Sequence, residues 1–204
     1  MQVLIVGDSF AADWSVKHND LFGWPNLLAK HHNLINLAQA GVSEYKIYKQ
    51  LISVNLTQFD LVIVAHTSPY RVVTRHHPVH YNNSLHKHAD LLFGDVEYHY
   101  KKTLNGFFNK SVRCAYNFFN LHFDHEYQEL SYQLIVERIE KLLCDIPNIT
   151  LVTPVALKSC ITAKNVVTIV DNQIEFGSSN HLSIDTNQQL FNMLLEKINE
   201  INRA

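Results

Sequence analysis

Two short segments near opposite ends of the chain carry residues that could act together on an acyl group. GDSF, residues 7–10, follows the apolar run MQVLIV, and its serine, Ser9, is a candidate nucleophile. NHLS, residues 180–183, precedes a long amphipathic stretch, and its histidine, His181, is a residue type that can take up a proton near neutral pH. A serine hydroxyl is a weak nucleophile near neutral pH and needs such a base within hydrogen-bond reach. The simpler interpretation of GDS is a turn, because Gly, Asp and Ser are common where a strand ends.

Short apolar runs predict the strands that would carry these segments. The first and third runs are uninterrupted and rich in β-branched residues, which is typical of strands buried on both faces. We expect strands within residues 3–6, 33–41, 61–65, 149–154 and 165–170.

Apolar residues at helical spacing separate these runs. We expect helices over 24–32 with Pro25 at or near the first position, over 42–54 with Ser43 as the cap, over about 120–143, and from residue 180 onward. The third helix should present one apolar face, made of Leu130, Leu134, Ile135, Ile139 and Leu142. The last should face the core with Leu190, Met193, Leu194 and Ile198. Alternating strands and helices predict an α/β fold with a parallel sheet covered on both faces, and a site outside the carboxyl ends of its strands.

Three segments of the chain resemble those of the SGNH hydrolases, also called GDSL-like esterases. They are VLIVGDSF, NLAQAGVS and NHLS, and the resemblance covers both ends and the middle strands but leaves residues 72–148 largely outside. It implies a three-layer α/β/α, flavodoxin-like fold with a central parallel sheet, and acyl-ester hydrolysis. It also implies that Ser9 is the nucleophile and His181 the base. The backbone N–H groups of Ser9 and Gly41 would then form part of the oxyanion hole.

The chain departs from the family pattern at two places. VIVAHTSPYR stands where the family has Gly-x-Asn-Asp, which places His66 at the glycine and makes Ser68, at the asparagine, a candidate oxyanion donor through its hydroxyl. Ser178 stands where the triad carboxylate would be. One oxyanion donor is worth roughly 10²–10³ in kcat, and the acid of a serine-protease triad about 10⁴. The candidates for orienting His181 are a backbone carbonyl near Ser178 and three carboxylates, Asp171, Glu175 and Asp185.

Four residues near the expected site are candidate substrate contacts, namely Trp14, His66, Tyr70 and Arg71. Trp14 follows the nucleophile turn and would either wall the pocket or belong to the core. The Arg71 guanidinium suits a carboxylate or phosphate on the substrate, and the alternative is a surface arginine in a loop. For Asp8 we expect a structural role, in which the side chain holds the turn.

Residues 72–110 are polar and weakly periodic, and we interpret them as an insertion that forms a lid over the pocket. Six histidines lie in this segment: His76, His77, His80, His86, His88 and His99. A metal site is the competing interpretation, and His86 and His88 have the spacing of a strand. Neither a cysteine pair nor a motif of spaced carboxylates accompanies them. We therefore expect imidazoles that supply hydrogen bonds, and neither a metal nor an organic cofactor.

Length and composition predict one domain over residues 1–204, since 47% of the residues are apolar and 18% are charged. A net charge of −2 gives no electrostatic footprint for nucleic acid or an anionic membrane. We find no apolar stretch of membrane-spanning length and no signal-peptide pattern. The cysteines, Cys114, Cys144 and Cys160, fit neither a disulfide framework nor a zinc pattern, so we expect them to be buried in a cytoplasmic protein.

Together these features predict a serine hydrolase that cleaves small acyl esters, with acetyl favoured, by a Ser9–His181 dyad or triad. The polar insertion favours a polar alcohol such as a carbohydrate, because a lipase would more naturally have an apolar lid. One alternative is a catalytically degenerate SGNH domain that binds a glycan or a protein. Another is a flavodoxin-like binding domain in which GDS occurs by chance.

Overall fold

The computed structural model describes residues 1–16, 22–80, 82, 86–102, 108–170 and 180–203. Within them, five strands form one parallel sheet in the order β2-β1-β3-β4-β5. The strands are β1 (Gln2–Gly7), β2 (Asn33–Asn36), β3 (Leu61–His66), β4 (Asn148–Val152) and β5 (Val166–Thr168). This order is that of flavodoxin-like, doubly wound sheets. The predicted α/β fold with a central parallel sheet is confirmed.

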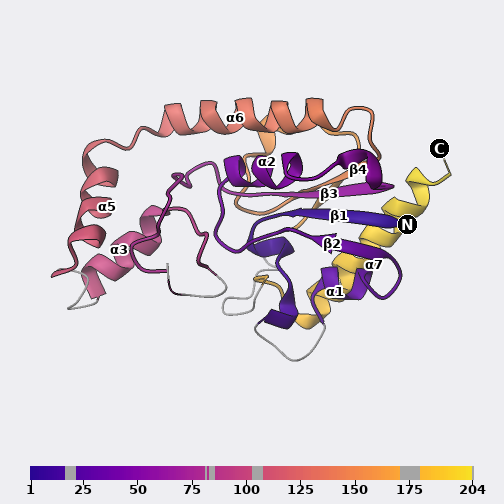
Figure 1. Cartoon of the computed structure of the whole chain (residues 1–204), viewed down its shortest axis with the longest axis horizontal. Coiled ribbons are helices and arrows are strands. Elements are labelled where there is room, and N and C mark those ends of the chain that lie inside the picture. The colour runs from indigo at the N-terminus through magenta and orange to yellow at the C-terminus, as the bar shows by residue number, and fades with distance from the viewer. Residues whose placement is uncertain (17–21, 81, 83–85, 103–107, 171–179, 204) are drawn as a thin grey trace.

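Helices cover both faces of the sheet, with α2 and α6 on one face and α1 and α7 on the other (Figure 1). The helices are α1 (Trp24–Leu28), α2 (Glu44–Ile52), α3 (Phe93–Lys102), α5 (Lys110–Leu121), α6 (His125–Leu142) and α7 (Ile184–Ile201). Pro25 lies in the first turn of α1, as predicted. Ser43 is the N-cap residue of α2, but its side chain makes no capping hydrogen bond.

The alternation of side chains along the strands produces two apolar cores. Val3 and Ile5 of β1 pack with Trp24 of α1 and Leu194 of α7. Leu4 and Val6, which alternate with them along β1, pack on the other face with Ile47 and Leu51 of α2 and Ile139 of α6. A strand that is apolar at every position therefore serves both cores, and burying each such side chain contributes roughly 1.5–3 kcal/mol.

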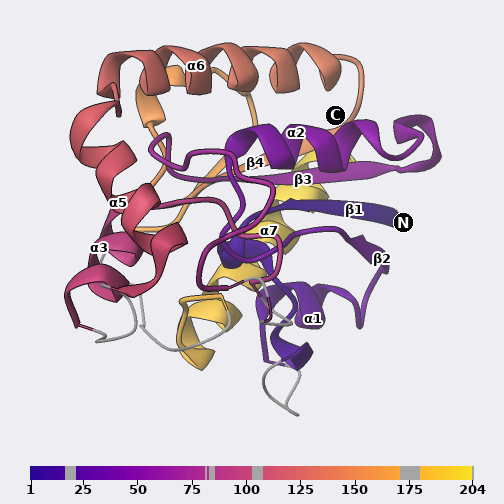
Figure 2. The same cartoon turned by 60° about the vertical axis from the view of Figure 1, so that its left-hand side comes forward.

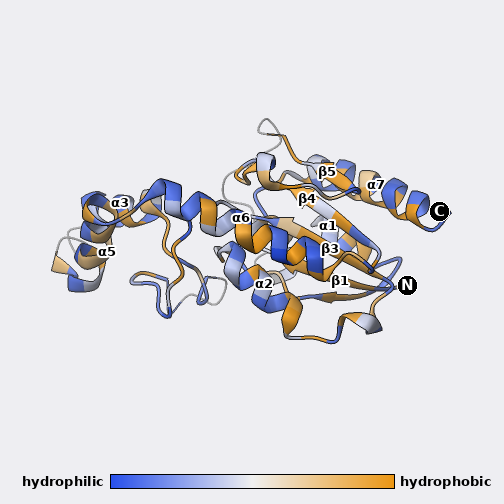
Figure 3. Ribbon diagram, turned by 90° about the horizontal axis from the view of Figure 1, so that it is seen from above, coloured by the Kyte–Doolittle hydropathy of each residue, from blue (hydrophilic) through white to orange (hydrophobic). Residues whose placement is uncertain are grey.

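The described residues of 72–123, which we call the extension, lie beyond the carboxyl ends of the strands (Figures 1 and 2). Its helices α3 and α5 project away from the sheet in the view of Figure 3. A third, small apolar cluster joins them, with Val96, Ala115 and Phe119 as its buried members. An antiparallel bridge between Val72 and Leu91 closes the segment that precedes α3.

The helices near the extension correct the sequence prediction. The helix expected over 120–143 is the end of α5 followed by α6, because Asp124 caps a new helix by accepting from the N–H of Tyr127 at 2.9 Å. Helix α3 and most of α5 were missed, because residues 72–110 were interpreted as a polar insertion and the next helix was expected only from about residue 120. Leu130, Leu134 and Met193 are exposed rather than buried. In α6 the buried stripe passes through residues 132, 136 and 139, on the side of the helix away from Leu134.

The cysteines also differ from the prediction. Cys114 and Cys144 are exposed and Cys160 is partly exposed. Cys114 is on the solvent side of α5, whose buried side is formed by Val112, Ala115 and Phe119. Among the helices that the structure describes, none has the length and apolar character needed to cross a membrane.

Candidate active site

The turn that carries Ser9, the candidate nucleophile, follows β1 directly, and we call it the nucleophile turn. Close packing against β3 explains why its first residue, Gly7, is a glycine. Ser9 begins a single 3₁₀ turn, Ser9–Ala11, and Asp8 caps it by accepting from the N–H of Phe10 at 3.0 Å. A Cβ on Gly7 would lie 2.7 Å from the Cβ of Ala65 on β3. The side chain of Gln50 accepts from the Gly7 N–H at 2.9 Å and donates to its carbonyl at 3.2 Å. The end of β1 is therefore held by packing against Ala65 on one side and by the two hydrogen bonds to Gln50 on the other.

The structure brings the two candidate catalytic side chains together. The Nε2 atom of His181 lies 2.9 Å from the Oγ atom of Ser9, across 172 residues of sequence. His181 has a φ of 60°, a left-handed conformation that is uncommon outside glycine and is kept only where the surroundings enforce it. Ser9 is only 3% exposed, so its hydroxyl is directed at the imidazole rather than at open solvent.

A network of buried amides holds the chain next to His181, where Asn187 Nδ2 donates to the carbonyls of Leu182 and Ser183. The side chains of Asn180 and Asn187 pair with each other, at 2.6 Å from Asn180 Nδ2 to Asn187 Oδ1. The same Oδ1 accepts from the N–H of Trp24 at 2.8 Å. The Trp24 indole N–H donates to the carbonyl of Phe10 at 2.9 Å, and the Phe10 ring packs on the His181 ring at 5.1 Å. Trp24 and the two asparagines thus connect the nucleophile turn to the histidine.

Sequence reasoning missed these three positioning residues. The available signal was Asn187, a polar residue on the face of the last helix that otherwise packs against the core. Of the groups expected to orient His181, Ser178, Asp171 and Glu175 lie outside the described residues. Asp185 is exposed in the first turn of α7.

The Gly41 loop is tied to the extension. Gly41 has a φ of 79°, and a Cβ on it would lie 2.8 Å from the Cβ of Ala89. Its carbonyl accepts from the N–H of Asp90 at 2.9 Å and from Arg71 Nη1 at 3.1 Å. The Asp90 carboxylate accepts from the N–H of Ser43 at 2.8 Å. Glycine is needed here because a side chain would be strained in this conformation and would collide with the extension.

Arg71 belongs to a network under the nucleophile turn. Its Nε donates to Thr67 Oγ1 at 3.2 Å, and that hydroxyl donates to Asp8 Oδ2 at 2.6 Å. Burial raises the pKa of the Asp8 carboxyl, against the opposing effects of the Arg71 charge, the Thr67 hydroxyl and the Phe10 N–H. Arg71 is thus partly buried and structurally engaged, and the alternative of a free surface arginine does not fit. Thr67 was not singled out from the sequence.

The remaining predicted contacts have separate outcomes. His66 is completely buried with Nδ1 2.7 Å from Glu44 Oε1, which favours a structural role over the predicted substrate contact. Trp14 is 6% exposed, which favours the core interpretation. The Tyr70 hydroxyl donates to Glu129 of α6. Ser68 Oγ accepts from the Tyr70 N–H at 3.2 Å, within its own loop.

A cavity of about 310 Å³ lies beside this loop. Its lining includes Glu44, Ser68, Arg71 and Tyr132, from α2, the loop after β3, and α6. Ser9 and His181 are not among its lining residues. Arg71 is, and it also donates to the carbonyl of Gly41.

Comparisons with known proteins give only distant likenesses. No protein-family model matches the chain, and no curated protein matches it. One similar solved structure is a protein of the G-D-S-L family from Desulfitobacterium hafniense DCB-2, proposed to be lipolytic; it is 12% identical, with a TM-score of 0.47, and the match covers 96% of this chain and 98% of that one. Another is an extracellular lipase from Streptomyces rimosus, 12% identical with a TM-score of 0.36, matched over 98% of this chain and 74% of that one.

Proposed function

We propose that this chain is a serine hydrolase that acts on carboxylic esters through Ser9 and His181. The observation that carries the proposal is the 2.9 Å contact between Ser9 Oγ and His181 Nε2, at the carboxyl end of β1 where ligands of doubly wound sheets bind. A hydroxyl hydrogen-bonded to an imidazole is the arrangement that activates a serine for attack.

In the proposed reaction, Ser9 Oγ attacks the ester carbonyl as its proton moves to His181 Nε2. The imidazolium then gives this proton to the leaving alcohol, and an acyl-serine forms. Water, deprotonated by the same imidazole, hydrolyses that intermediate. We assign the oxyanion to the backbone N–H groups of Ser9 and Gly41, whose loop the Arg71 and Asp90 contacts hold in place.

For the substrate we propose a small acyl group, acetyl in the first instance, on a polar alcohol such as a carbohydrate. The 3% exposure of Ser9 supports a small acyl group, because little space opens directly onto the nucleophile. The polar alcohol rests on the polar insertion and on Ser68 and Arg71, which line the cavity beside apolar residues such as Val72 and Ile135.

Turnover of p-nitrophenyl acetate by the wild type and by Ser9→Ala and His181→Ala tests the reaction. We expect both variants to lose activity, and a fluorophosphonate to label the wild type on Ser9 only. Acetylated xylose and p-nitrophenyl palmitate then test the substrate proposal. Faster cleavage of the palmitate would reject the carbohydrate and keep the hydrolase.

The low exposure of Ser9 also favours a second candidate function, a catalytically degenerate domain that binds a glycan or protein. Absence of both turnover and label, in a folded wild type, would support that candidate against the hydrolase. Labelling of Ser9 without turnover of small esters would instead indicate a reactive serine with a narrow substrate range.

A further inference from the structure

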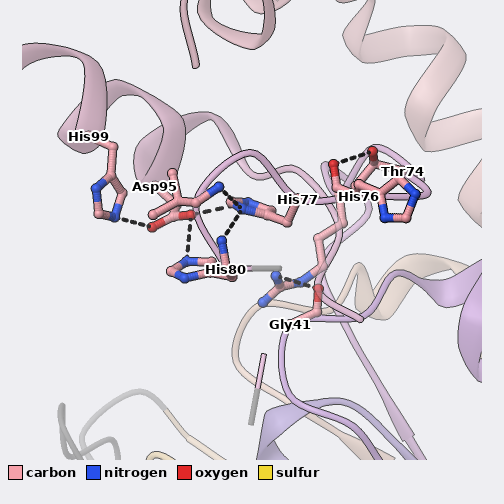
Figure 4. Close-up of polar contacts among 9 residues, drawn as sticks. Gly41, Thr74, His76, His77, His80, Asp95 and His99 are labelled. Carbon is pink, nitrogen blue, oxygen red and sulfur yellow. Dashed lines mark hydrogen bonds and ion pairs between the residues drawn. The ribbon is translucent and has the colours of Figure 1, made fainter. Parts of the chain in front are cut away.

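A cluster of imidazoles around one carboxylate lies in the extension, outside the candidate active site. His77 and His80 come from the loop before α3, and Asp95 and His99 from α3 itself (Figure 4). His77 is 1% exposed, so this is an interior group rather than a solvated histidine run. The sequence offered no carboxylate partner for these histidines because Asp95 is separated from His80 by 15 residues.

The donor atoms of the cluster converge. His77 Nε2 lies 3.2 Å and His80 Nε2 3.0 Å from the same oxygen, Oδ2 of Asp95. Ligand atoms of His77, His80 and Asp95 all lie within 4.8 Å of one another. Ligands about 2.0–2.2 Å from a tetrahedral zinc ion are roughly 3.3 Å apart. The two distances from the imidazole nitrogens to Asp95 Oδ2 are close to this separation.

We propose that His77, His80 and Asp95 form a binding site for a divalent transition-metal ion, with zinc as the ion that fits best. Two neutral imidazoles and one carboxylate are a nitrogen and oxygen set that zinc accepts and magnesium does not prefer. A water molecule would complete a four-coordinate ion. The inference is independent of ester hydrolysis, since none of its ligands belongs to the dyad.

Two neighbouring contacts shape the proposed site. His99 Nε2 faces the other carboxylate oxygen of Asp95 at 3.6 Å and would orient the carboxylate for the ion. His77 Nδ1 accepts from the N–H groups of Val79 and His80, both at 3.3 Å. If Nε2 of His77 binds the ion, the ring proton must be on Nδ1. Nδ1 can then no longer accept, so the two hydrogen bonds are lost. Because of that cost and the three-ligand set, we expect micromolar rather than nanomolar affinity.

The site would connect the extension to the wall of the candidate active site. The His80 ring lies 5.3 Å from the ring of His86, and the chain then continues to Ala89 and Asp90, which contact Gly41. An ion that fixes His77 and His80 to Asp95 therefore restrains the segment that supports the Gly41 loop. Its first effect should be on stability, by mass action on the folded state.

Calorimetric titration of the metal-free chain with Zn²⁺, without a histidine purification tag, tests the site. We expect one ion per chain, a higher midpoint of thermal unfolding, and no competition from Mg²⁺. The variants His80→Asn and Asp95→Asn should each weaken binding by at least about tenfold, since single supporting groups of metal sites are already worth 10–100-fold. His88→Asn is the matched control, because His88 is exposed in the same segment, and it should bind as the wild type does.

Cobalt(II) provides a readout that does not depend on whether a variant folds. Its visible absorption on the wild type should show a four- or five-coordinate ion with nitrogen ligands, and Zn²⁺ should abolish the signal. Absence of Zn²⁺ binding by the wild type would overturn the proposal. It would also be overturned if His80→Asn and His88→Asn weakened binding equally, because the ion would then lie elsewhere.

Discussion

The sheet and the extension are stabilised in different ways. The strands β1 and β3 are apolar on both faces and pack against helices there, as with Val62 and Ile63 of β3. In the part of the extension that the structure describes, the apolar cluster has three buried members, and a carboxylate surrounded by imidazoles lies beside them. Hydrophobic burial changes little with pH or ions, whereas the polar cluster responds to both. The sheet should therefore be the stable part and the extension the condition-dependent part.

The candidate active site lies where these two regions meet. Ser9 and His181 are positioned by the sheet and its α1 and α7 helices. Gly41 is contacted by Ala89 and Asp90 of the extension. The dyad should thus tolerate changes in the extension better than the proposed oxyanion loop does.

The largest effect on stability should come from truncating a buried valine of the sheet, Val64 in β3. Val96 in α3 is equally buried in the extension and is the matched comparison. We expect Val64→Ala to lower the free energy of global unfolding by about 2–3 kcal/mol, for the lost methyl groups and the cavity. Val96→Ala should cost less, since alanine favours a helix, and should mainly increase hydrogen exchange in α3. Equal losses of global stability in urea would show that the two regions unfold as one unit.

The next largest effect should follow from Asn187→Ala. This change removes a polar contact that positions His181 but leaves the apolar packing of α7 against the sheet in place. It leaves the buried N–H of Trp24 and the amide of Asn180 without their partner, at a cost of about 1–3 kcal/mol. If the chain is an esterase, kcat should fall more than KM changes, because His181 loses its support. Gln188→Ala, at an exposed neighbouring position, should change neither quantity.

A smaller effect should appear in the pH dependence of the extension. Burial, together with the neighbouring charges of His80, His181 and Arg71, lowers the pKa of His86 to about 4 despite the opposing effect of Asp95. The folded state then binds fewer protons than the unfolded state, whose histidine has a pKa near 6.5. The contribution of His86 to stability is complete above about pH 6.5 and is lost as the pH falls toward 4.

Thermal unfolding measured between pH 7 and 5 checks this expectation. The midpoint of the wild type should fall with pH, and His86→Asn should flatten part of the fall. His122→Asn changes an exposed histidine and should leave the slope unchanged. A slope that is the same in all three proteins would remove His86 as a cause.

Asp95 contributes at lower pH. Burial alone would raise its pKa, but hydrogen bonds from His77 and His80 lower it well below the usual value. Its contribution is present above the unfolded pKa near 3.8 and is lost as the pH falls through the folded value. The loss attributable to Asp95 should therefore begin only after most of the His86 effect is complete.

The smallest effect should come from two helix caps. Ser183 caps α7 by accepting from the N–H of Thr186 at 3.1 Å, and Asn109 caps α5 by accepting from the N–H of Ser111 at 3.0 Å. Replacement of either by alanine should cost about 1 kcal/mol. Ser183→Ala should lower global stability in urea, whereas Asn109→Ala should be detected mainly as faster hydrogen exchange in α5. An unchanged exchange rate in α5 would contradict a locally unfolding extension.

Much of the sheet was predictable because local patterns determine it. Uninterrupted runs such as residues 61–65 can only be buried on both faces, and Pro25 marks the start of a helix. The pairing of Ser9 with His181 was expected from the family resemblance of the segments VLIVGDSF and NHLS, because GDS by itself is equally well explained as a turn. The extension was not predicted, although α5 carries a helical signal in Val112, Ala115 and Phe119. The loop before α3 carries no such signal, because its contacts are polar and join residues far apart in the sequence.

The sequence by itself determined the order of strands and helices and the segments that hold Ser9 and His181. Only the tertiary structure decided which distant groups meet: Asp95 with His77 and His80, Glu44 with His66, and Asn187 with Trp24. It also decided which face of α6 is buried and left Leu134 exposed. The physical reason is that periodicity reports contacts within a few residues, whereas a polar pair across the fold has no period and depends on how the layers pack.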